Sequence, residues 1–272
     1  LEEAKLEFSD LNGIAYTAGP GLRGPLLIGA SMAKSLAFSL KIPSTGIHHM
    51  EAHLLINLLE DPAPKFPFLT LLISGGHCLL INAKELGSYE IVGQTIDDAV
   101  GEAFDKSGKI LGLGYPAGPE IDKRAKLGNP RAFPFTKPKV DGLNFSFSGL
   151  KTAILYFVQR EVKANPNFIE ENLNDICASI QYTIINILID KLKLATKQTG
   201  IKQIAIGGGV SANSGIRQTL KDAELKYGWK TFIPKFEFTT DNAAMIAIVG
   251  YLKYLDEDFA EQGITASARL KI

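Results

Sequence analysis

Three of the chain's four histidines fall within six residues, at His48, His49 and His53. His49 and His53 are four residues apart, a spacing that places both imidazoles on one face of a helix, about one turn apart. Two imidazoles arranged in this way can share one metal ion, usually zinc or iron. The alternative is a pair of histidines that merely decorates a helix surface. The concentration of histidines here favours a metal site whose third ligand comes from elsewhere.

The position of Glu51 argues against a protease. Zinc proteases of the His-Glu-x-x-His type place their catalytic glutamate one residue after the first histidine. Glu51 follows His49 by two residues, which is about 200° around a helix. Its carboxylate therefore points away from an ion held by the two histidines.

Further candidate binding residues lie in turns beside strand-like apolar runs. Residues 74–76 and 207–209 follow such runs, and the second turn also precedes a helix. Backbone N–H groups in turns of this kind can bind a phosphate. Each turn alone is weak support, because a glycine-rich turn is often only structural. A glycine- and proline-rich turn at 114–119 and an aspartate at a helix start, Asp241, extend the pattern.

Composition describes an ordinary globular protein of 272 residues with 46% apolar residues and no net charge. This length suits one large or two modest domains. A neutral chain is not a uniformly basic nucleic-acid binder. Cys78 and Cys177 are far apart and without a partner motif, so we expect buried, inert thiols and a reducing cytoplasm. No apolar run is long enough to span a membrane.

Residues 106–139 differ from this neutral background. They hold eight basic residues against two acids, a local excess of six positive charges. The stretch is either a solvated loop or a surface that contacts the phosphates of a nucleic acid. The basic residues are Lys106, Lys109, Lys123, Arg124, Lys126, Arg131, Lys137 and Lys139.

The order of apolar patterns and turns predicts an α/β architecture with ligands at the carboxyl ends of strands. Residues 1–8 resemble the end of an amphipathic helix. We expect strands at 13–17, 43–47, 68–73, 78–81, 89–96, 204–206 and 231–233. We expect helices at 26–40, 50–59, 97–111 and 243–255, and a helix from 214 to about 227. Residues 145–152 are expected to open a helix that runs to about 163, and residues 170–197 to form one long helix or two.

Taken together and in order, eight strings closely resemble the bacterial branch of one family. This is the tRNA N6-adenosine threonylcarbamoyltransferase family, formerly called O-sialoglycoprotein endopeptidase. The resemblance spans about residues 10 to 250. The strings are TAGPGL-x-G, HHMEAH, SGGH, DDA-x-GEAFDK, LGLGYP-x-GP, FSFSGLKT, GGGVSAN and TTDNAAMIA.

The resemblance implies a two-lobed actin/Hsp70/sugar-kinase-like fold with a nucleotide cleft between the lobes. Residues 1–70 would be the remainder of the first lobe, with the metal helix. Residues 71–240 would form the second lobe, including the basic, proline-rich insertion 114–140. Residues 241–272 would return to the first lobe. The family's N-terminal phosphate-binding hairpin has no counterpart here, so we expect an N-terminally truncated chain that is impaired as an enzyme by itself.

The family's site residues are carried over position by position. Its metal ligands fall on His49, His53 and Asp241, with iron(II) favoured over zinc, and Asp241 would bridge the two lobes. Its phosphate loop falls on Gly207, Gly208 and Gly209, and no catalytic residue is assigned. Its substrate contacts fall on Leu72, Ile73, Ser74, Gly75, Gly76, Asp105, Gly118, Asp122 and Asn213.

The implied reaction moves a threonylcarbamoyl group from threonylcarbamoyl-adenylate to N6 of the adenosine just 3′ of the tRNA anticodon, and releases AMP. Implied partners are tRNA, a paralogous subunit of the same fold and a small ATPase subunit, with no membrane. No Ser/His/Asp triad is visible in the sequence, so we expect direct transfer without a covalent enzyme intermediate. The expected location is the cytoplasm.

Two small departures from the family pattern are Cys78, where threonine is usual, and Ala117, where glycine is frequent. The alternatives are another carbamoyltransferase or a kinase of the same fold, and a non-catalytic partner subunit. A kinase would not need His49 and His53, so a bound metal discriminates against it. A non-catalytic paralogue would be expected to lose the metal ligands, and all three are present.

Overall fold

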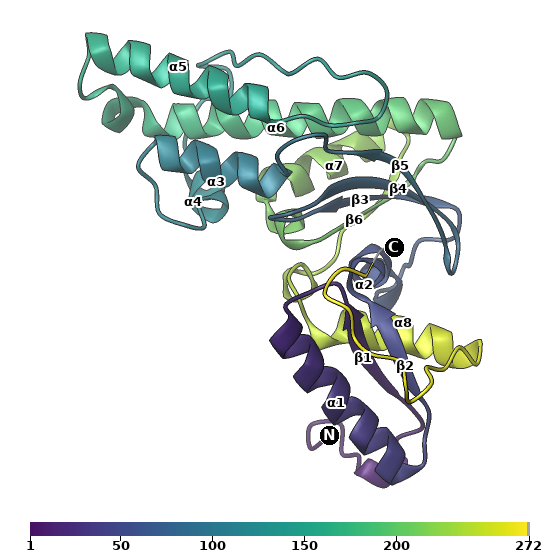
Figure 1. The fold of residues 1–272 in the computed structure, drawn as a ribbon. Helices are drawn as coiled ribbons and strands as arrows, with labels where there is room; N and C mark the ends of the chain where they lie inside the picture. Colours follow the sequence, from purple (N-terminus) through teal and green to yellow (C-terminus); the bar gives the residue numbers. More distant parts are fainter. Residues whose placement is uncertain (271–272) are drawn as a thin grey trace. The chain divides into compact units, whose positions relative to one another are not determined.

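The computed structural model describes residues 1–270, and the chain divides into two compact units. Unit 1 comprises Leu1–Ala63 and the chain from Thr240 onward, and unit 2 comprises Pro64–Thr239. Each unit contains β-strands and helices (Figure 1), so the predicted α/β class is confirmed. Within the described residues, no helix combines the length and apolar character needed to cross a membrane.

Unit 1 is built on two parallel strands that α1 connects. The chain leaves this unit after η2 and returns with α8, which packs directly on β1. A Cβ at Gly250 would lie 2.3 Å from that of Ala15, so glycine permits this close approach. The elements are η1 (Phe8–Asp10), β1 (Ile14–Gly19), α1 (Arg23–Leu40), β2 (Ser44–His48), α2 (His49–Leu55), η2 (Ile56–Leu59) and α8 (Ala243–Leu255).

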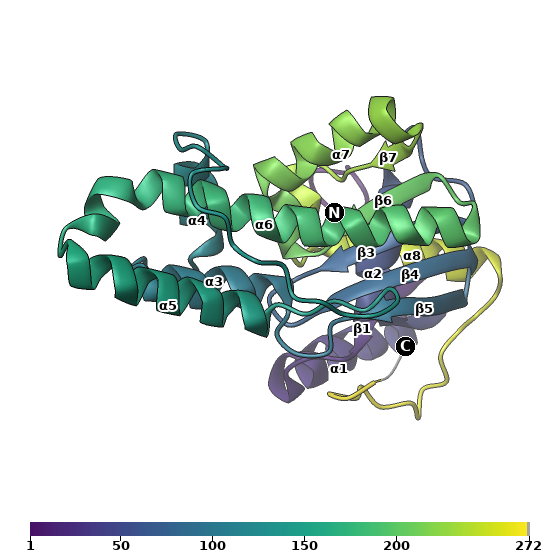
Figure 2. The same cartoon turned by 90° about the horizontal axis from the view of Figure 1, so that it is seen from above.

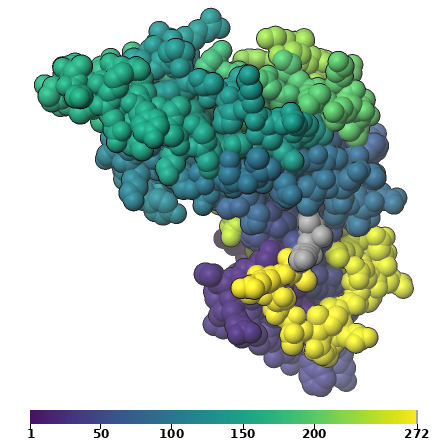
Figure 3. Space-filling view, turned by 45° about the horizontal axis from the view of Figure 1, so that its top comes forward, coloured from purple at the N-terminus to yellow at the C-terminus, as the bar shows by residue number. Residues whose placement is uncertain are grey.

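The C-terminal segment of unit 1 lies along β1. Ser267 N donates to Ala18 O over 2.7 Å, and Gly21 N donates to Ala268 O over 3.4 Å. Figure 3 shows this segment in yellow beside the purple N-terminal part of the same unit. The expectation of a helix over residues 1–8 is wrong, since these residues form turns that lead into η1. Leu1 and Leu6 remain about half exposed, so no packing against the rest of the unit stabilises a helix here.

Unit 2 contains a five-stranded sheet in the order β5-β4-β3-β6-β7. The pairs β3–β4 and β4–β5 are antiparallel, whereas β3–β6 and β6–β7 are parallel. All six residues of β3 are buried, as expected for a central strand covered on both faces. The strands are β3 (Phe68–Ile73), β4 (Cys78–Glu85), β5 (Ser88–Gln94), β6 (Gln203–Gly207) and β7 (Lys230–Phe232).

The longest helix, α6, runs across one face of this sheet with α7 beside it (Figures 1 and 2). Its inward stripe of isoleucine and leucine side chains forms much of the core of unit 2. The helical elements of unit 2 are α3 (Val100–Ile110), α4 (Gly118–Ala125), α5 (Ser148–Ala164), α6 (Phe168–Thr199), η3 (Gly209–Ala212), α7 (Ser214–Tyr227) and η4 (Phe236–Phe238).

Both cysteines are buried free thiols in the core of unit 2. Burial raises the pKa of Cys177 to about 11 and also raises the pKa of the Cys78 thiol. Because the thiolate is the reactive form, we predict that neither thiol reacts with a thiol reagent in the native protein at pH 8. Both should react once the protein is unfolded in guanidinium. Rapid reaction of either cysteine in the native state would contradict this packing.

Candidate functional site

The histidine helix α2 follows β2 without a loop, and His48 forms the junction. Its Nδ1 accepts a hydrogen bond from Met50 N over 3.1 Å, which caps the first turn of α2. Its Nε2 lies 3.2 Å from Leu270 O and donates to it, since Nδ1 is already the acceptor. Burial lowers the pKa of His48, which favours the neutral ring that this arrangement needs. The third histidine of the cluster is therefore a structural residue.

The other two histidines converge on Asp241. The Nε2 atoms of His49 and His53 lie 3.5 Å and 3.0 Å from Asp241 Oδ1. One potential ligand atom from each of the three residues falls within a group no wider than 4.8 Å. The His53 side chain is buried and that of His49 is largely so, while Asp241 is 78% exposed. The cluster is thus anchored on a buried ring and open on the side of the carboxylate.

These three side chains fit a metal ion. Two ligand atoms about 2.1 Å from a tetrahedral ion lie about 3.4 Å apart, and the observed separations of 3.0 Å and 3.5 Å bracket that value. Two imidazole nitrogens and one carboxylate oxygen form a donor set typical of zinc and of non-haem iron(II).

Packing of α8 against α2 places Asp241 beside the histidines. Asp241 precedes α8, whose first turn is capped by Asn242 through a 2.9 Å bond from Met245 N. Asp241 belongs to the same unit as His49 and His53, so the expectation that it bridges two lobes is wrong. The reason is that the chain re-enters unit 1 at Thr240, just before this residue.

Glu51 takes no part in the three-residue cluster. Its side chain is buried and lies 3.9 Å from Lys253 Nζ on α8. This agrees with the helical angle that points Glu51 away from the histidine face. The cluster therefore lacks the glutamate that a protease of the His-Glu-x-x-His type requires.

In unit 2, the two glycine turns meet at one end of the sheet. Leu72 on β3 is paired with Gly207 on β6, so the carboxyl ends of these parallel strands lie side by side. Gly208 has φ +83°, and a Cβ there would lie 2.5 Å from Ile73 O. Only glycine allows the second turn to pass so closely over the end of β3. Leu72 and Ile73 have buried side chains, which leaves only their backbone groups for a ligand.

The N-terminus of α3 packs against the first turn. Gly101 N donates to Ser74 O over 3.2 Å, and a Cβ at Gly101 would lie 2.7 Å from that oxygen. Gly75 and Gly76 have open space around their Cα atoms and are exposed. The first turn is therefore held by α3 while its glycine backbone faces outward.

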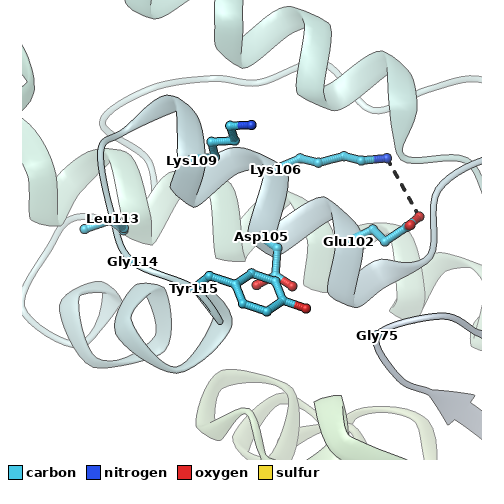
Figure 4. A pocket seen from close by; sticks show the side chains of 8 residues that line it. All are labelled: Gly75, Glu102, Asp105, Lys106, Lys109, Leu113, Gly114 and Tyr115. Atoms are coloured by element: carbon cyan, nitrogen blue, oxygen red, sulfur yellow. Dashed lines mark ion pairs between the residues drawn. The ribbon is translucent and has the colours of Figure 1, made fainter.

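Asp105 and Gly75, both predicted site residues, line a cavity of about 450 Å³ (Figure 4). Asp105 Oδ1 accepts from Ala117 N over 2.8 Å, which ties α3 to the turn that opens α4 at Gly118. Figure 4 shows the ring of Tyr115 beside the Asp105 carboxylate. The remaining lining residues are Glu102, Lys106, Lys109, Leu113 and Gly114.

Sequence reasoning did not single out Glu102 or Tyr115 as site residues. The signal was present, since both lie inside strings that carried the resemblance. Lys106 pairs with Asp98 and lies 3.8 Å from Glu102. The contact between Glu102 and Lys106 joins residues four apart on α3, a spacing that the string already contains, whereas Asp98 lies before the helix that carries Lys106.

Asp122 and Asn213 are brought together by Ser214. Asp122 accepts from Ser214 Oγ over 2.8 Å and from Ser214 N over 3.2 Å. Asn213 precedes this serine and caps α7 by accepting from Ile216 N over 3.0 Å. Both predicted residues therefore help to fix the start of α7.

The basic stretch is partly neutralised by neighbouring acids. Arg124 pairs with Glu120 and Lys126 with Asp122, each one turn away on α4. Lys137 pairs with Asp190 on α6. Four basic residues of the stretch form no ion pair within the described part of the chain, namely Lys109, Lys123, Arg131 and Lys139.

The fold and the site define a two-unit α/β protein that combines a candidate metal centre with candidate phosphate-binding turns. Its fold is similar to that of HypF. A HypF from T. kodakarensis gives a TM-score of 0.65 at 13% identity, covering 95% of this chain and 42% of that one. A full-length HypF in the phosphate- and nucleotide-bound form gives 0.58 at 13% identity, covering 82% and 38%. At this identity the likeness concerns the fold alone.

Sequence comparison identifies the family. The model for tRNA N6-adenosine threonylcarbamoyltransferase matches residues 1–248. Relatives with that name are 63% identical in Christiangramia forsetii and 53% identical in Riemerella anatipestifer. Each of these matches covers 100% of this chain and 81% of the relative. The chain belongs to the tRNA N6-adenosine threonylcarbamoyltransferase family, so the predicted family and its transferase class are confirmed.

The converging cluster generates a direct prediction about metal content. His53→Ala and Asp241→Ala should each reduce the metal content from about one ion per chain to close to none, because two remaining ligands hold an ion poorly. Metal analysis after gel filtration measures this, with circular dichroism as the check on folding. His77→Ala is the matched control, since that ring lies outside the cluster, and it should retain the ion. Full metal retention in folded His53→Ala or Asp241→Ala protein would refute the ligand assignment.

Proposed function

We propose that this protein transfers the threonylcarbamoyl group of threonylcarbamoyl-adenylate to N6 of the adenosine 3′ of the anticodon in tRNA. The observation that carries the proposal is the convergence of His49, His53 and Asp241 in a chain of this family. His53 and Asp241 are 188 residues apart in sequence, yet their side chains lie 3.0 Å apart. Such a cluster would not be retained by a non-catalytic scaffold that had lost its metal.

The reaction is an acyl transfer to an amine. The N6 nitrogen attacks the carbamoyl carbon, a C–N bond forms, and the bond from that carbon to the phosphate oxygen breaks. AMP leaves with the electron pair of that bond, and N6 loses one proton. An exocyclic amine is a weak nucleophile, so we assign the main contribution of the protein to positioning and to stabilising the departing phosphate.

The adenylate would bind in unit 2. The turns at 74–76 and 207–209 offer backbone N–H groups for the phosphate. The cavity beside Asp105 has a volume in the range typical of small-molecule sites. The Asp105 carboxylate can accept hydrogen bonds from ribose hydroxyl groups. The other proposed contacts with the substrate are Gly118, Asp122 and Asn213.

His49, His53 and Asp241 would hold one divalent ion, and we favour iron(II) over zinc because two histidines and one carboxylate form the usual triad of non-haem iron. When bound, the ion supplies a Lewis acid for oxygen atoms of the substrate. The buried ring of His53 and the exposed carboxylate of Asp241 would anchor the ion while leaving it accessible on one side.

The proposed partners are tRNA, a paralogous subunit of the same fold and a small ATPase subunit, all in the cytoplasm. The exposed face of α1 supports a helix-packing partner. Ile28, Met32 and Phe38 are between 66% and 74% exposed, and a Cβ at Gly24 or Gly29 of the same helix would meet no atom within 4 Å. Large apolar side chains interspersed with small residues suit close approach of another helix.

For tRNA we propose the unpaired members of the basic stretch, Lys109, Lys123, Arg131 and Lys139. Lys109 is also at the cavity that Asp105 lines. Arg124 and Lys126 are weaker candidates, because each already contacts a carboxylate one helical turn away.

The transfer itself can be tested with purified protein, the family's partner subunits, threonylcarbamoyl-adenylate and unmodified tRNA. We expect the modified adenosine to appear in nuclease digests analysed by mass spectrometry. Asp241→Ala should lower the rate at least about a hundredfold if the ion is needed, whereas Asp256→Ala, an exposed aspartate beyond α8, should not. Absence of the modified nucleoside with the wild-type protein would overturn the proposal.

The tRNA surface has its own test in the salt dependence of binding. Replacing Lys109, Lys123 and Arg131 with alanine should reduce the slope of log K against log salt by about two to three units, since each phosphate contact contributes about 0.7 to 0.9. The control replaces Lys163, Lys226 and Lys230, which removes the same charge elsewhere. Equal slopes in the two triple variants would place the tRNA site on another surface.

A further inference from the structure

Gln181 is a polar residue on the inward stripe of α6. Its neighbours on that stripe include Ile180, Ile184 and Leu188, all buried, and Gln181 itself is only 7% exposed. Burial of an amide side chain is unfavourable unless its polar atoms find hydrogen-bond partners. The proposed function gives Gln181 no role. The hydrogen-bond partner of its side chain indicates one.

That partner is Asn213. Asn213 Nδ2 donates to Gln181 Oε1 over 2.7 Å, and Asn213 is itself buried. Asn213 Oδ1 accepts from Ile216 N over 3.0 Å. A backbone N–H can only donate, so Oδ1 must face Ile216 and Nδ2 must face Gln181. The two bonds together leave the Asn213 amide a single orientation.

The first turn of α7 also restricts the position of the Gln181 side chain. A Cβ at Gly215 would lie 2.6 Å from Gln181 Nε2 and 2.9 Å from Ile185 Cδ1. Glycine at this position therefore lets α7 approach α6 closely enough for the bond between Gln181 and Asn213. A methyl group there would push the glutamine amide away from Asn213 without removing any polar group.

We propose that Gln181 is a positioning residue that makes Asn213 a hydrogen-bond donor to the substrate. An asparagine amide carries two N–H bonds. One is used by Gln181, and the described residues provide no hydrogen-bond partner for the other. The group that Asn213 recognises is consequently an acceptor, namely a hydroxyl, carboxylate or phosphate oxygen. This inference rests on the proposed role of Asn213 in substrate binding.

The test is a double-mutant cycle on the KM for threonylcarbamoyl-adenylate in the transfer assay with tRNA. Gln181→Leu should raise KM by about three- to tenfold with little change in kcat, the effect of misdirecting one hydrogen bond. Asn213→Ala should raise KM at least as much. Adding Gln181→Leu to Asn213→Ala should raise KM no further, because the glutamine acts through the asparagine.

Three more variants separate positioning from simple loss of stability. Asn213→Asp keeps the oxygen that caps α7 but has no N–H, so it should match the KM of Asn213→Ala while remaining folded. Gly215→Ala should also raise KM, since it displaces Gln181. Thr183→Val removes another buried polar group of α6 and should leave KM unchanged. Within residues 1–270, the Thr183 hydroxyl bonds only to Ser179 O of the same helix.

The outcomes distinguish the two proposals. If Asn213→Ala and Asn213→Asp both leave KM unchanged, the assignment of Asn213 to the substrate site fails, and the positioning role fails with it. If those variants raise KM and folded Gln181→Leu does not, only the positioning role is overturned. An equal effect of Gln181→Leu in the wild-type and Asn213→Ala backgrounds would also overturn that role, since Gln181 would then act independently of Asn213.

Discussion

The parallel pairing of β3 with β6 is the interaction on which the candidate binding site of unit 2 depends. It joins strands separated by four helices and aligns Leu72 with Gly207, so two glycine turns emerge at the same edge. Closing so long an intervening chain costs conformational entropy. Burial of apolar residues of α6 and α3 in the core of unit 2 offsets that cost, and the same helices carry Gln181 and Asp105.

The candidate metal site of unit 1 is also assembled from segments distant in sequence, and here a returning helix, α8, takes the place of the returning strand. Its two histidines come from one turn of α2, but the carboxylate arrives only when the chain returns after Thr239. The contact between Gly250 of α8 and Ala15 of β1 sets how closely α8 approaches β1. Asp241, just before that helix, is thereby directed at the rings of His49 and His53. Both candidate sites therefore depend on the completed fold of their own unit.

Local patterns were sufficient for much of this architecture. Helical spacing predicted the shared face of His49 and His53, and the apolar run at 68–73 predicted β3, because both signals are contained in a few residues. Long-range contacts explain what was missed. Asp97 was expected to open a helix, but it accepts from Phe147 N over 2.8 Å at the start of α5, and α3 begins only at Val100. The contact of His48 Nε2 with Leu270 O and the bond between Gln181 and Asn213 likewise join residues distant in sequence.

The central claim is that this chain moves the threonylcarbamoyl group directly from the adenylate to tRNA. Rapid-quench single-turnover kinetics with a label in the threonylcarbamoyl carbon tests it most directly, by following label in adenylate, protein and tRNA together with AMP. The account predicts that label passes from adenylate to tRNA with one AMP released per modified adenosine, and that none becomes protein-bound, as both cysteines are buried. A protein-bound pool that forms and decays at the rate of transfer would contradict it.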